Sequence, residues 1–130
     1  MCIFCDIVKG DIPARIIYED DKFLAFMDAF PRAVGHTLII PKEHFETFDE
    51  LPKELACEMM EVIHKIVKKL EKLEMDGYNL LNNNKQVSGQ EVPHVHFHII
   101  PRYENEGYPV YVLKDPINVD LDSIYDRIME

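Results

Sequence analysis

The run His94-Val95-His96-Phe97-His98 constrains the fold of this chain more than any other feature. Its strict alternation of polar and apolar side chains has the period of a β-strand, so it predicts that the three histidines share one face of a sheet. Val95 and Phe97 then occupy the opposite face, where burial fixes the register of the strand. Imidazole titrates near neutral pH, binds metals and can act as a nucleophile. The run therefore indicates a reactive site on one face of the sheet.

A single metal ion held by all three histidines is disfavoured by geometry. Same-face neighbours on a strand lie about 6.8 Å apart, so His94 and His98 are separated by roughly 13 Å of backbone. Metal–nitrogen bonds of about 2.0–2.1 Å require ligand atoms that converge. Two adjacent histidines can meet this requirement, so a metalloenzyme that uses such a pair stays open, as does a solvated polar face. We expect the three histidines to have different roles.

The rest of the chain indicates an α+β domain. Strand-like segments occur at residues 16–19, 23–27, 37–40, 78–82 and 95–103. Apolar residues recur at helical spacing from about residue 52 to residue 74, and Leu121, Ile124, Tyr125 and Ile128 suggest a short helix near the C-terminus. Short connections between strands, with one long helix among them, favour antiparallel pairing. We expect a mainly antiparallel five-stranded sheet, one long helix and short terminal helices in a single domain spanning residues 1–130.

Composition and charge exclude several classes of protein. The formal net charge of −10 disfavours binding to nucleic acid, although a few local donors such as Lys42 and Arg102 could still hold a small phosphorylated ligand. No apolar run approaches the roughly 20 residues that span a bilayer, and the N-terminus lacks a signal-peptide pattern. Three cysteines fit a reducing compartment better than a disulfide scaffold. We therefore expect a cytoplasmic protein without a membrane partner.

The cysteines and the isolated histidine of the long helix have simple interpretations. Cys57 lies in the helical pattern and is predicted to be a small core residue. His64 stands beside charged residues and is predicted to be exposed. Cys2 and Cys5 form a C-x-x-C motif that does not open a helix after a strand, so redox chemistry is possible but a thioredoxin-like site is disfavoured.

Several further segments, together with the histidine run and Ile99-Ile100 after it, resemble the histidine triad (HIT) family. The family motif is His-φ-His-φ-His-φ-φ, where φ is apolar. The other matching segments are Phe26-Met27-Asp28, Gly35 to His44, Asn83, Gly89-Gln90 and Pro101-Arg102. The resemblance covers residues 2–103 and leaves residues 104–130 as a variable C-terminal segment. Cys2 and Cys5 place the chain nearer the Hint-like and prokaryotic branch than the Fhit branch. The resemblance implies the HIT fold.

The same resemblance implies a nucleotidyl hydrolase or transferase. Such an enzyme cleaves the α-phosphate bond of nucleoside phosphoramidates or dinucleoside polyphosphates and releases a nucleoside monophosphate, with a purine nucleotide of the adenosine type favoured. His96 is the implied nucleophile, which forms a nucleotidyl-histidine intermediate. His98 and His36 are the implied hydrogen-bond partners of the phosphate oxygens or of the leaving atom. The implied nucleotide-binding residues are Asp28, which matches the acceptor of the ribose hydroxyls, and Asn83, Gly89, Gln90 and Glu91.

The resemblance also implies a structural zinc site and a homodimer. Cys2, Cys5, His44 and His94 match the zinc ligands of some members, and two thiolates with two imidazoles form a closed tetrahedral site. No catalytic cofactor is implied, because the nucleophile is a side chain. The alternative for this cluster is a free thiol pair, with His94 serving only to orient the active site.

Two residues depart from the family pattern, and an alternative function stays open. Glu91 stands where eukaryotic Hint proteins carry a serine that assists the leaving group, so either Glu91 delivers the proton or this step differs. Lys85 stands where many members have glycine. The alternative to an enzyme is a nucleotide-binding regulatory or scaffold protein in which catalysis is vestigial.

Overall fold

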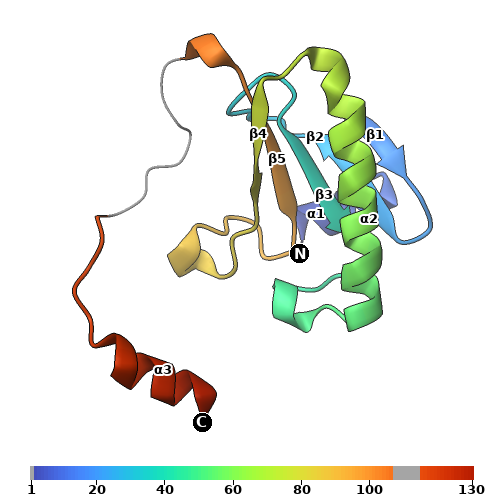
Figure 1. Ribbon diagram of the computed structural model, residues 1–130. Coiled ribbons are helices and arrows are strands. Elements are labelled where there is room, and N and C mark those ends of the chain that lie inside the picture. Colours follow the sequence, from blue (N-terminus) through green and yellow to red (C-terminus); the bar gives the residue numbers. More distant parts are fainter. Residues whose placement is uncertain (1, 107–114) are drawn as a thin grey trace.

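A five-stranded antiparallel sheet forms the centre of the molecule (Figure 1). The structure is a computed structural model that describes residues 2–106 and 115–130. The strand order is β1-β2-β3-β5-β4, with β1 Ile16–Glu19, β2 Phe23–Met27, β3 Thr37–Pro41, β4 Gly77–Leu81 and β5 Phe97–Arg102. The helices are α1 Ile3–Lys9, α2 Lys53–Leu70 and α3 Leu121–Met129. The predicted α+β class is confirmed, and so is the central position of the third strand.

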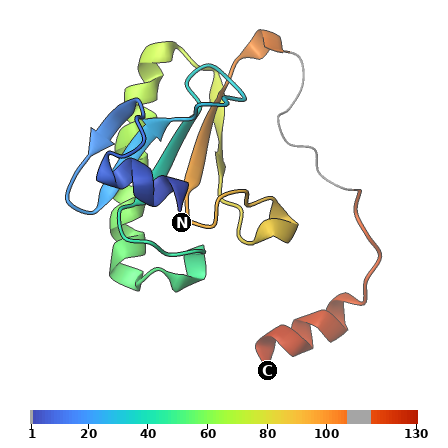
Figure 2. The same cartoon turned by 180° about the vertical axis from the view of Figure 1, so that it is seen from behind.

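The two faces of the sheet are covered by different helices. Figures 1 and 2 show α2 on one face and α1 on the other. Inward residues alternate along β3, because Ile39 belongs to the core beneath α2 whereas Leu38 and Ile40 belong to the core beneath α1. Val95 and Phe97 lie in the α2 core, as the alternation predicts. The histidines are therefore directed to the α1 side of the sheet.

The histidine run enters the sheet later than the sequence predicts. β5 begins at Phe97, so only His98 of the three histidines lies within a strand. The N–H of Val95 donates to the carbonyl of Phe45 at 2.7 Å, and the amide of Asn82 donates to the carbonyl of His96 at 2.9 Å. These partners belong to loops rather than to a neighbouring strand, which is why the ladder starts only after His96.

The helix α2 buries one stripe and exposes the rest. Its buried residues are Met59, Val62, Ile63, Ile66 and Leu70. Cys57 is exposed, so its predicted place in the core was wrong. At about 100° per residue, a position two residues before Met59 lies on the opposite side of the helix. His64 is exposed, as predicted.

The C-terminal helix lies apart from the sheet in both views (Figures 1 and 2). The Asp120 carboxylate accepts from the N–H of Ser123 at 3.2 Å and caps α3, so the predicted short helix is confirmed. Every residue from 115 to 130 is exposed. In the parts of the chain that the structure describes, no helix is both long and apolar enough to cross a bilayer.

Candidate active site

His96 carries a free imidazole lone pair at the surface of the α1 side. Its Nδ1 lies 2.8 Å from the carbonyl oxygen of His94, which can only accept, so Nδ1 carries the proton and Nε2 has the lone pair. Within residues 2–106 and 115–130, no buried side-chain nitrogen or oxygen lacks a hydrogen-bond partner. Because Nε2 of His96 has no such partner there, this atom must reach solvent. The His94 carbonyl thus fixes the tautomer that a nucleophilic imidazole needs.

A chain of hydrogen bonds fixes the tautomers of His36 and His98. The backbone N–H of Arg32 donates to Nδ1 of His36 at 3.0 Å, so the proton of neutral His36 is on Nε2. That Nε2–H donates to Nδ1 of His98 at 2.9 Å, which leaves the proton of His98 on its own Nε2. The two residues meet because Leu38 pairs with His98 in the sheet and His36 stands two residues before Leu38. His98 therefore presents a donor, and His96 an electron pair.

Burial keeps these imidazoles neutral. It lowers the pKa of His98 to about 4, with a further contribution from the positive charges that His96 and His36 would carry. Burial also lowers the pKa of His36, although the neighbouring Asp28 carboxylate raises it. The pKa of His96 is lowered by burial too, despite opposing contributions from the His94 carbonyl and from Asp28 and Glu91. Neutrality preserves the donor and acceptor pattern at pH 7.

We expect the protein to lose stability as the pH falls from about 6.5 towards 4. An unfolded histidine titrates near 6.5, whereas folded His98 titrates at about 4, so within this window only the unfolded state binds the proton. The stability linked to His98 is therefore complete above pH 6.5 and decreases as the pH falls. Urea unfolding across this range measures the decrease, which should be smaller in His98→Gln. Equal decreases in both proteins would contradict this linkage.

Asp28 lies with the two linked histidines. Its Oδ2 is 3.5 Å from Nε2 of His36, and its Oδ1 accepts from the N–H of Phe30 at 2.9 Å. Ligand atoms of Asp28, His36 and His98 all lie within 4.8 Å of one another. The structure therefore brings together three of the predicted site residues, with Asp28 directly after β2 and His36 directly before β3.

The loop between β4 and β5 is organised by Gln90. This residue is buried, and its amide donates to the carbonyls of Glu46 at 2.7 Å and Val92 at 3.1 Å. Its Oε1 accepts from the N–H of Lys85 at 2.7 Å. The resemblance assigns Gln90 to nucleotide binding, whereas here both amide hydrogens are directed at backbone carbonyls. In this structure Gln90 holds the shape of the loop.

Gly89 and Asn83 are neighbours in the same loop. Gly89 has a φ of 104°, a conformation that residues with a side chain adopt only under strain. A Cβ added at Gly89 would lie 3.4 Å from Nδ2 of Asn83. The positive φ, rather than a lack of space, is therefore what favours glycine at this position.

Lys85 occupies a backbone conformation that favours glycine. Its φ of 75° and ψ of 155° lie in a region that is strained for any other residue. We expect Lys85→Gly to raise the free energy of unfolding by about 1 kcal/mol, although it removes the ion pair between Lys85 and Glu46. Chemical denaturation measures this, and Lys69→Gly in α2 should instead destabilise the protein. A lower free energy of unfolding in Lys85→Gly would contradict the conclusion that the backbone of Lys85 is strained.

The two cations suggested for phosphate binding have other partners. Nζ of Lys42 lies 2.8 Å from a carboxylate oxygen of Glu19. The guanidinium of Arg102 donates to Glu106 and to the side-chain oxygen of Asn79. Donors for a phosphate beside His96 are therefore expected from the imidazoles and from the loop backbone.

The four predicted metal ligands form one cluster beside the reactive histidines. Nδ1 of His94 lies 3.3 Å from Sγ of Cys2 and 3.3 Å from Nδ1 of His44, and Sγ of Cys5 lies 3.4 Å from Nδ1 of His44. Nε2 of His94 donates to the Pro41 carbonyl at 2.8 Å, so the Nδ1 lone pair points into the cluster. Bond lengths of about 2.0–2.3 Å in a tetrahedral zinc site put ligand atoms roughly 3.3–3.8 Å apart. These residues fit a zinc ion.

Phe4 is a site residue that the sequence analysis missed. It lies on α1 between Cys2 and Cys5, and its ring meets the ring of His96 edge to face, with centroids 5.1 Å apart at 90°. It also contacts the ring of His94, with centroids 5.8 Å apart. The sequence shows Phe4 only as part of an apolar N-terminal segment. Its position between the two cysteines was the one available signal.

Comparison with known proteins settles the family. A family model described as "HIT domain" matches residues 9–105. The chain belongs to the HIT family. This HIT protein is 53% identical over 128 residues to an uncharacterized HIT-like protein of Methanocaldococcus jannaschii, with 98% of each chain covered. It is 43% identical over 115 residues to an adenosine 5'-monophosphoramidase of Schizosaccharomyces pombe, with 85% of this chain and 84% of the relative covered.

Solved structures confirm the HIT fold. A member of the family from Bacillus subtilis superposes with a TM-score of 0.86 and 41% identity, covering 98% of this HIT protein and 94% of the other chain. A Zn-bound histidine triad family protein from Mycobacterium smegmatis superposes with a TM-score of 0.79 and 37% identity, covering 88% and 84%. The predicted fold and the resemblance to the HIT family are both confirmed.

Proposed function

We propose that this HIT protein is a nucleotide hydrolase of the purine nucleoside phosphoramidase type. It cleaves the α-phosphate bond of nucleoside phosphoramidates or dinucleoside polyphosphates and releases a nucleoside monophosphate. The observation that carries this proposal is the opposite polarity of two neighbouring imidazoles, a free lone pair on Nε2 of His96 and a proton on Nε2 of His98. Their ring centroids lie 4.9 Å apart, so one phosphate group can contact both.

In the first step, Nε2 of His96 attacks the α-phosphorus. The new P–N bond forms as the bond to the leaving group breaks, and the leaving group departs with the bonding electrons and takes up a proton from solvent. The imidazole becomes cationic, and its Nδ1–H bond to the His94 carbonyl strengthens accordingly. The Nε2–H of His98 donates to a phosphate oxygen and stabilises the charge that develops there. The product is a nucleotidyl-histidine.

In the second step, water attacks the same phosphorus and His96 is expelled with the electrons of the P–N bond. The proton lost by the water leaves with the nucleoside monophosphate or passes to solvent, and His96 returns to its starting tautomer. Dividing the displacement into two steps replaces one difficult attack by water with two easier reactions. Because His96 keeps its proton on Nδ1 throughout, its ring does not have to rotate between the two steps.

The nucleotide is held by residues around this pair. We propose that Asp28 accepts hydrogen bonds from the ribose hydroxyls, and that Asn83 and the backbone at Gly89 contact the phosphate. The resemblance to the HIT family suggests Glu91 as a residue on the leaving-group side. An adenosine nucleotide is favoured because the relative in Schizosaccharomyces pombe is named for an adenosine substrate. Gln90 contributes indirectly, through the shape of the loop.

A zinc ion held by Cys2, Cys5, His44 and His94 is proposed as a structural component. The four side chains would fill its coordination sphere, so the metal would fix α1 and the N-terminus against the sheet without touching substrate. The Zn-bound histidine triad family protein from Mycobacterium smegmatis supports this proposal. We expect the enzyme to act in the cytoplasm, since Cys2 and Cys5 bind metal only as reduced thiolates.

We further propose that two copies associate through β4. Within the described residues β4 pairs only with β5, so its outer edge has unpaired backbone groups, and Tyr78 and Leu80 on it are 47% and 48% exposed. An exposed, regular and apolar edge is suited to pairing with a second chain. We expect the wild type to have the mass of two chains in light scattering and Leu80→Lys to shift towards one. Equal masses of the wild type and Leu80→Lys would exclude the edge of β4 as the dimer contact.

The enzyme assay uses a fluorogenic adenosine phosphoramidate and, in parallel, diadenosine polyphosphates. Release of the amine and AMP from the phosphoramidate supports the proposed reaction. Release of AMP from the diadenosine polyphosphates would show that the enzyme also cleaves this second class of substrate. Tight AMP binding without turnover on either substrate would overturn the enzyme proposal in favour of a nucleotide-binding regulatory or scaffold protein.

A further inference from the structure

The two thiols of the predicted metal cluster lie close enough to react with one another. The N–H of Cys5 donates to Sγ of Cys2 at 3.4 Å, and ligand atoms of all four cluster residues lie within 4.8 Å of one another. Cys2 precedes α1 in an extended conformation, with φ −120° and ψ 121°, so its side chain can turn towards Cys5 without unwinding the helix. An S–S bond of about 2.0 Å is therefore within reach of these two sulfurs.

A disulfide between these cysteines and a bound zinc ion exclude one another. Zinc–sulfur bonds of about 2.3 Å in a tetrahedral site hold the two sulfurs roughly 3.8 Å apart, whereas a disulfide brings them to about 2.0 Å. A disulfide sulfur also lacks the thiolate charge that binds the metal. Oxidation would leave the metal with His44 and His94 alone, and two imidazoles do not complete the tetrahedral coordination of a structural zinc ion.

The two thiols are unequally placed for an oxidant that arrives from solvent. Sγ of Cys5 lies 3.4 Å from Nδ1 of His44, which is an exposed residue. Sγ of Cys2 lies 3.3 Å from Nδ1 of His94, which is fully buried. The oxidant therefore meets Cys5 first, and Cys2 is placed on the buried side to complete the disulfide.

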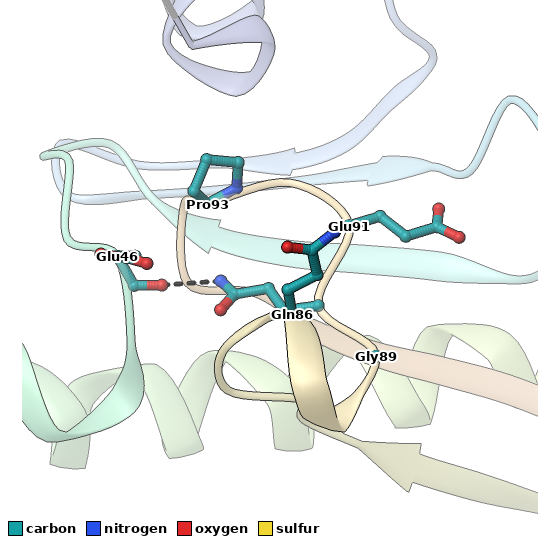
Figure 3. Close-up of a pocket in the computed structure, with 6 residues that line it drawn as sticks. Glu46, Gln86, Gly89, Glu91 and Pro93 are labelled. Atoms are coloured by element: carbon teal, nitrogen blue, oxygen red, sulfur yellow. Dashed lines mark hydrogen bonds between the residues drawn. The ribbon is translucent and has the colours of Figure 1, made fainter.

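The segment that follows the third cluster ligand is hydrogen-bonded to the active-site loops. The carbonyl of Phe45 accepts from the N–H of Val95 at 2.7 Å, directly before His96. The carbonyl of Glu46 accepts from the buried amide of Gln90 at 2.7 Å, a bond that ties this segment to the loop between β4 and β5 (Figure 3). The cluster and the nucleophile thus share one hydrogen-bonded framework, and loss of the metal loosens this framework beside His96.

We propose that Cys2 and Cys5 form a redox-sensitive modification site, at which a small-molecule disulfide oxidises the pair, expels the metal and lowers turnover. This inference rests on the zinc ion of the proposed function. The thiolate of Cys5 attacks the external disulfide and releases one thiolate. The thiolate of Cys2 then attacks the mixed disulfide on Cys5 and releases the second thiolate. The cysteines are thereby oxidised, the external disulfide is reduced to two thiolates, and Zn²⁺ leaves with the charge that balances them.

The test treats the zinc-loaded protein with glutathione disulfide in a Cys57→Ser background, which removes the exposed third thiol. Mass spectrometry under denaturing conditions should show a mass about 2 Da below that of the reduced protein. A zinc-sensitive dye should report release of stoichiometric zinc, and turnover should fall by about tenfold. A thiol reductant with added zinc should restore the mass, the zinc content and the turnover.

Two further variants in the same background test the order of attack. Cys2→Ser should accumulate the mixed disulfide on Cys5, whereas Cys5→Ser should form its adduct on Cys2 about tenfold more slowly. Equal rates in the two variants would overturn the assigned order.

Three results with the Cys57→Ser protein would overturn the modification site itself, namely a stable mixed disulfide in place of the internal one, zinc retained after oxidation, or unchanged turnover once the disulfide has formed. A reduced protein that contains no zinc would overturn the zinc component of the proposed function and this inference with it. A reduced protein without phosphoramidase activity would instead overturn the proposed reaction, whereas the mass and zinc measurements would still decide whether the disulfide forms and expels the metal.

Discussion

His96→Ala should lower kcat on an adenosine phosphoramidate by about 10³-fold or more, while AMP still binds. The substitution removes the atom that we propose forms the covalent intermediate, namely Nε2 of His96 with its free lone pair. It leaves the hydrogen bonds from Arg32 through His36 to His98 intact, so the proposed donor to the phosphate is retained. Single-turnover kinetics with a radiolabelled nucleotide should show a labelled protein intermediate in the wild type and none in the variant.

Two further variants separate loss of the nucleophile from damage to the fold. His96→Ala also leaves the His94 carbonyl without its partner, whereas His96→Asn can donate to that carbonyl and still offers no nucleophile. Both should be inactive, with His96→Asn the more stable protein in urea. His64→Ala, at an exposed position on α2, is the control and should keep full activity. Turnover within about tenfold of the wild type in His96→Asn would exclude His96 as the nucleophile.

The sequence predicted the elements that depend on local pattern. The predicted strands and the long helix match the structure, and in α2 the buried stripe has the apolar spacing that predicted the helix, because burial of one helix face requires that spacing. The division of labour among the histidines followed from the rise of a strand. In the structure His94 belongs to the cluster of predicted metal ligands, whereas His98 is hydrogen-bonded to His36.

Other features depend on contacts that no local pattern encodes. β5 begins only at Phe97 because Val95 and His96 find their hydrogen-bond partners in distant loops. Which side of α2 is buried is set by the apolar stripe as a whole, so the identity of Cys57 alone does not show that it lies on the exposed side. The tautomer of His98 depends on His36, which is 62 residues away in the chain and whose own tautomer is set by the N–H of Arg32. The loop-shaping role of Gln90 likewise needs the carbonyl of Glu46, which only the tertiary structure provides.

Removing the proposed zinc should lower the unfolding temperature by about 10 °C or more and should reduce turnover as a consequence. Two contacts join the cluster to the nucleophile. His94 supplies both a ligand nitrogen and the carbonyl that holds Nδ1 of His96, and Phe4, between the two cysteines, packs its ring against the ring of His96. Without metal, burial still holds the pKa of His94 at about 4, so no proton replaces the ion at pH 7. The cluster then loses the bonds that fix α1.

Metal analysis, thermal unfolding and hydrogen exchange of α1 test this in the wild type, after chelation, and in Cys5→Ser. Cys57→Ser is the matched control, because it removes an exposed thiol of α2 outside the cluster and should retain metal, stability and activity. A structural ion requires that stability and α1 protection fall together with turnover in Cys5→Ser. If chelation abolished turnover while the unfolding temperature and the protection of α1 were unchanged, the metal would act in catalysis, as the metalloenzyme hypothesis for adjacent histidines requires. If the purified protein contained no stoichiometric zinc, Cys2 and Cys5 would be a free thiol pair and His94 alone would orient the nucleophile.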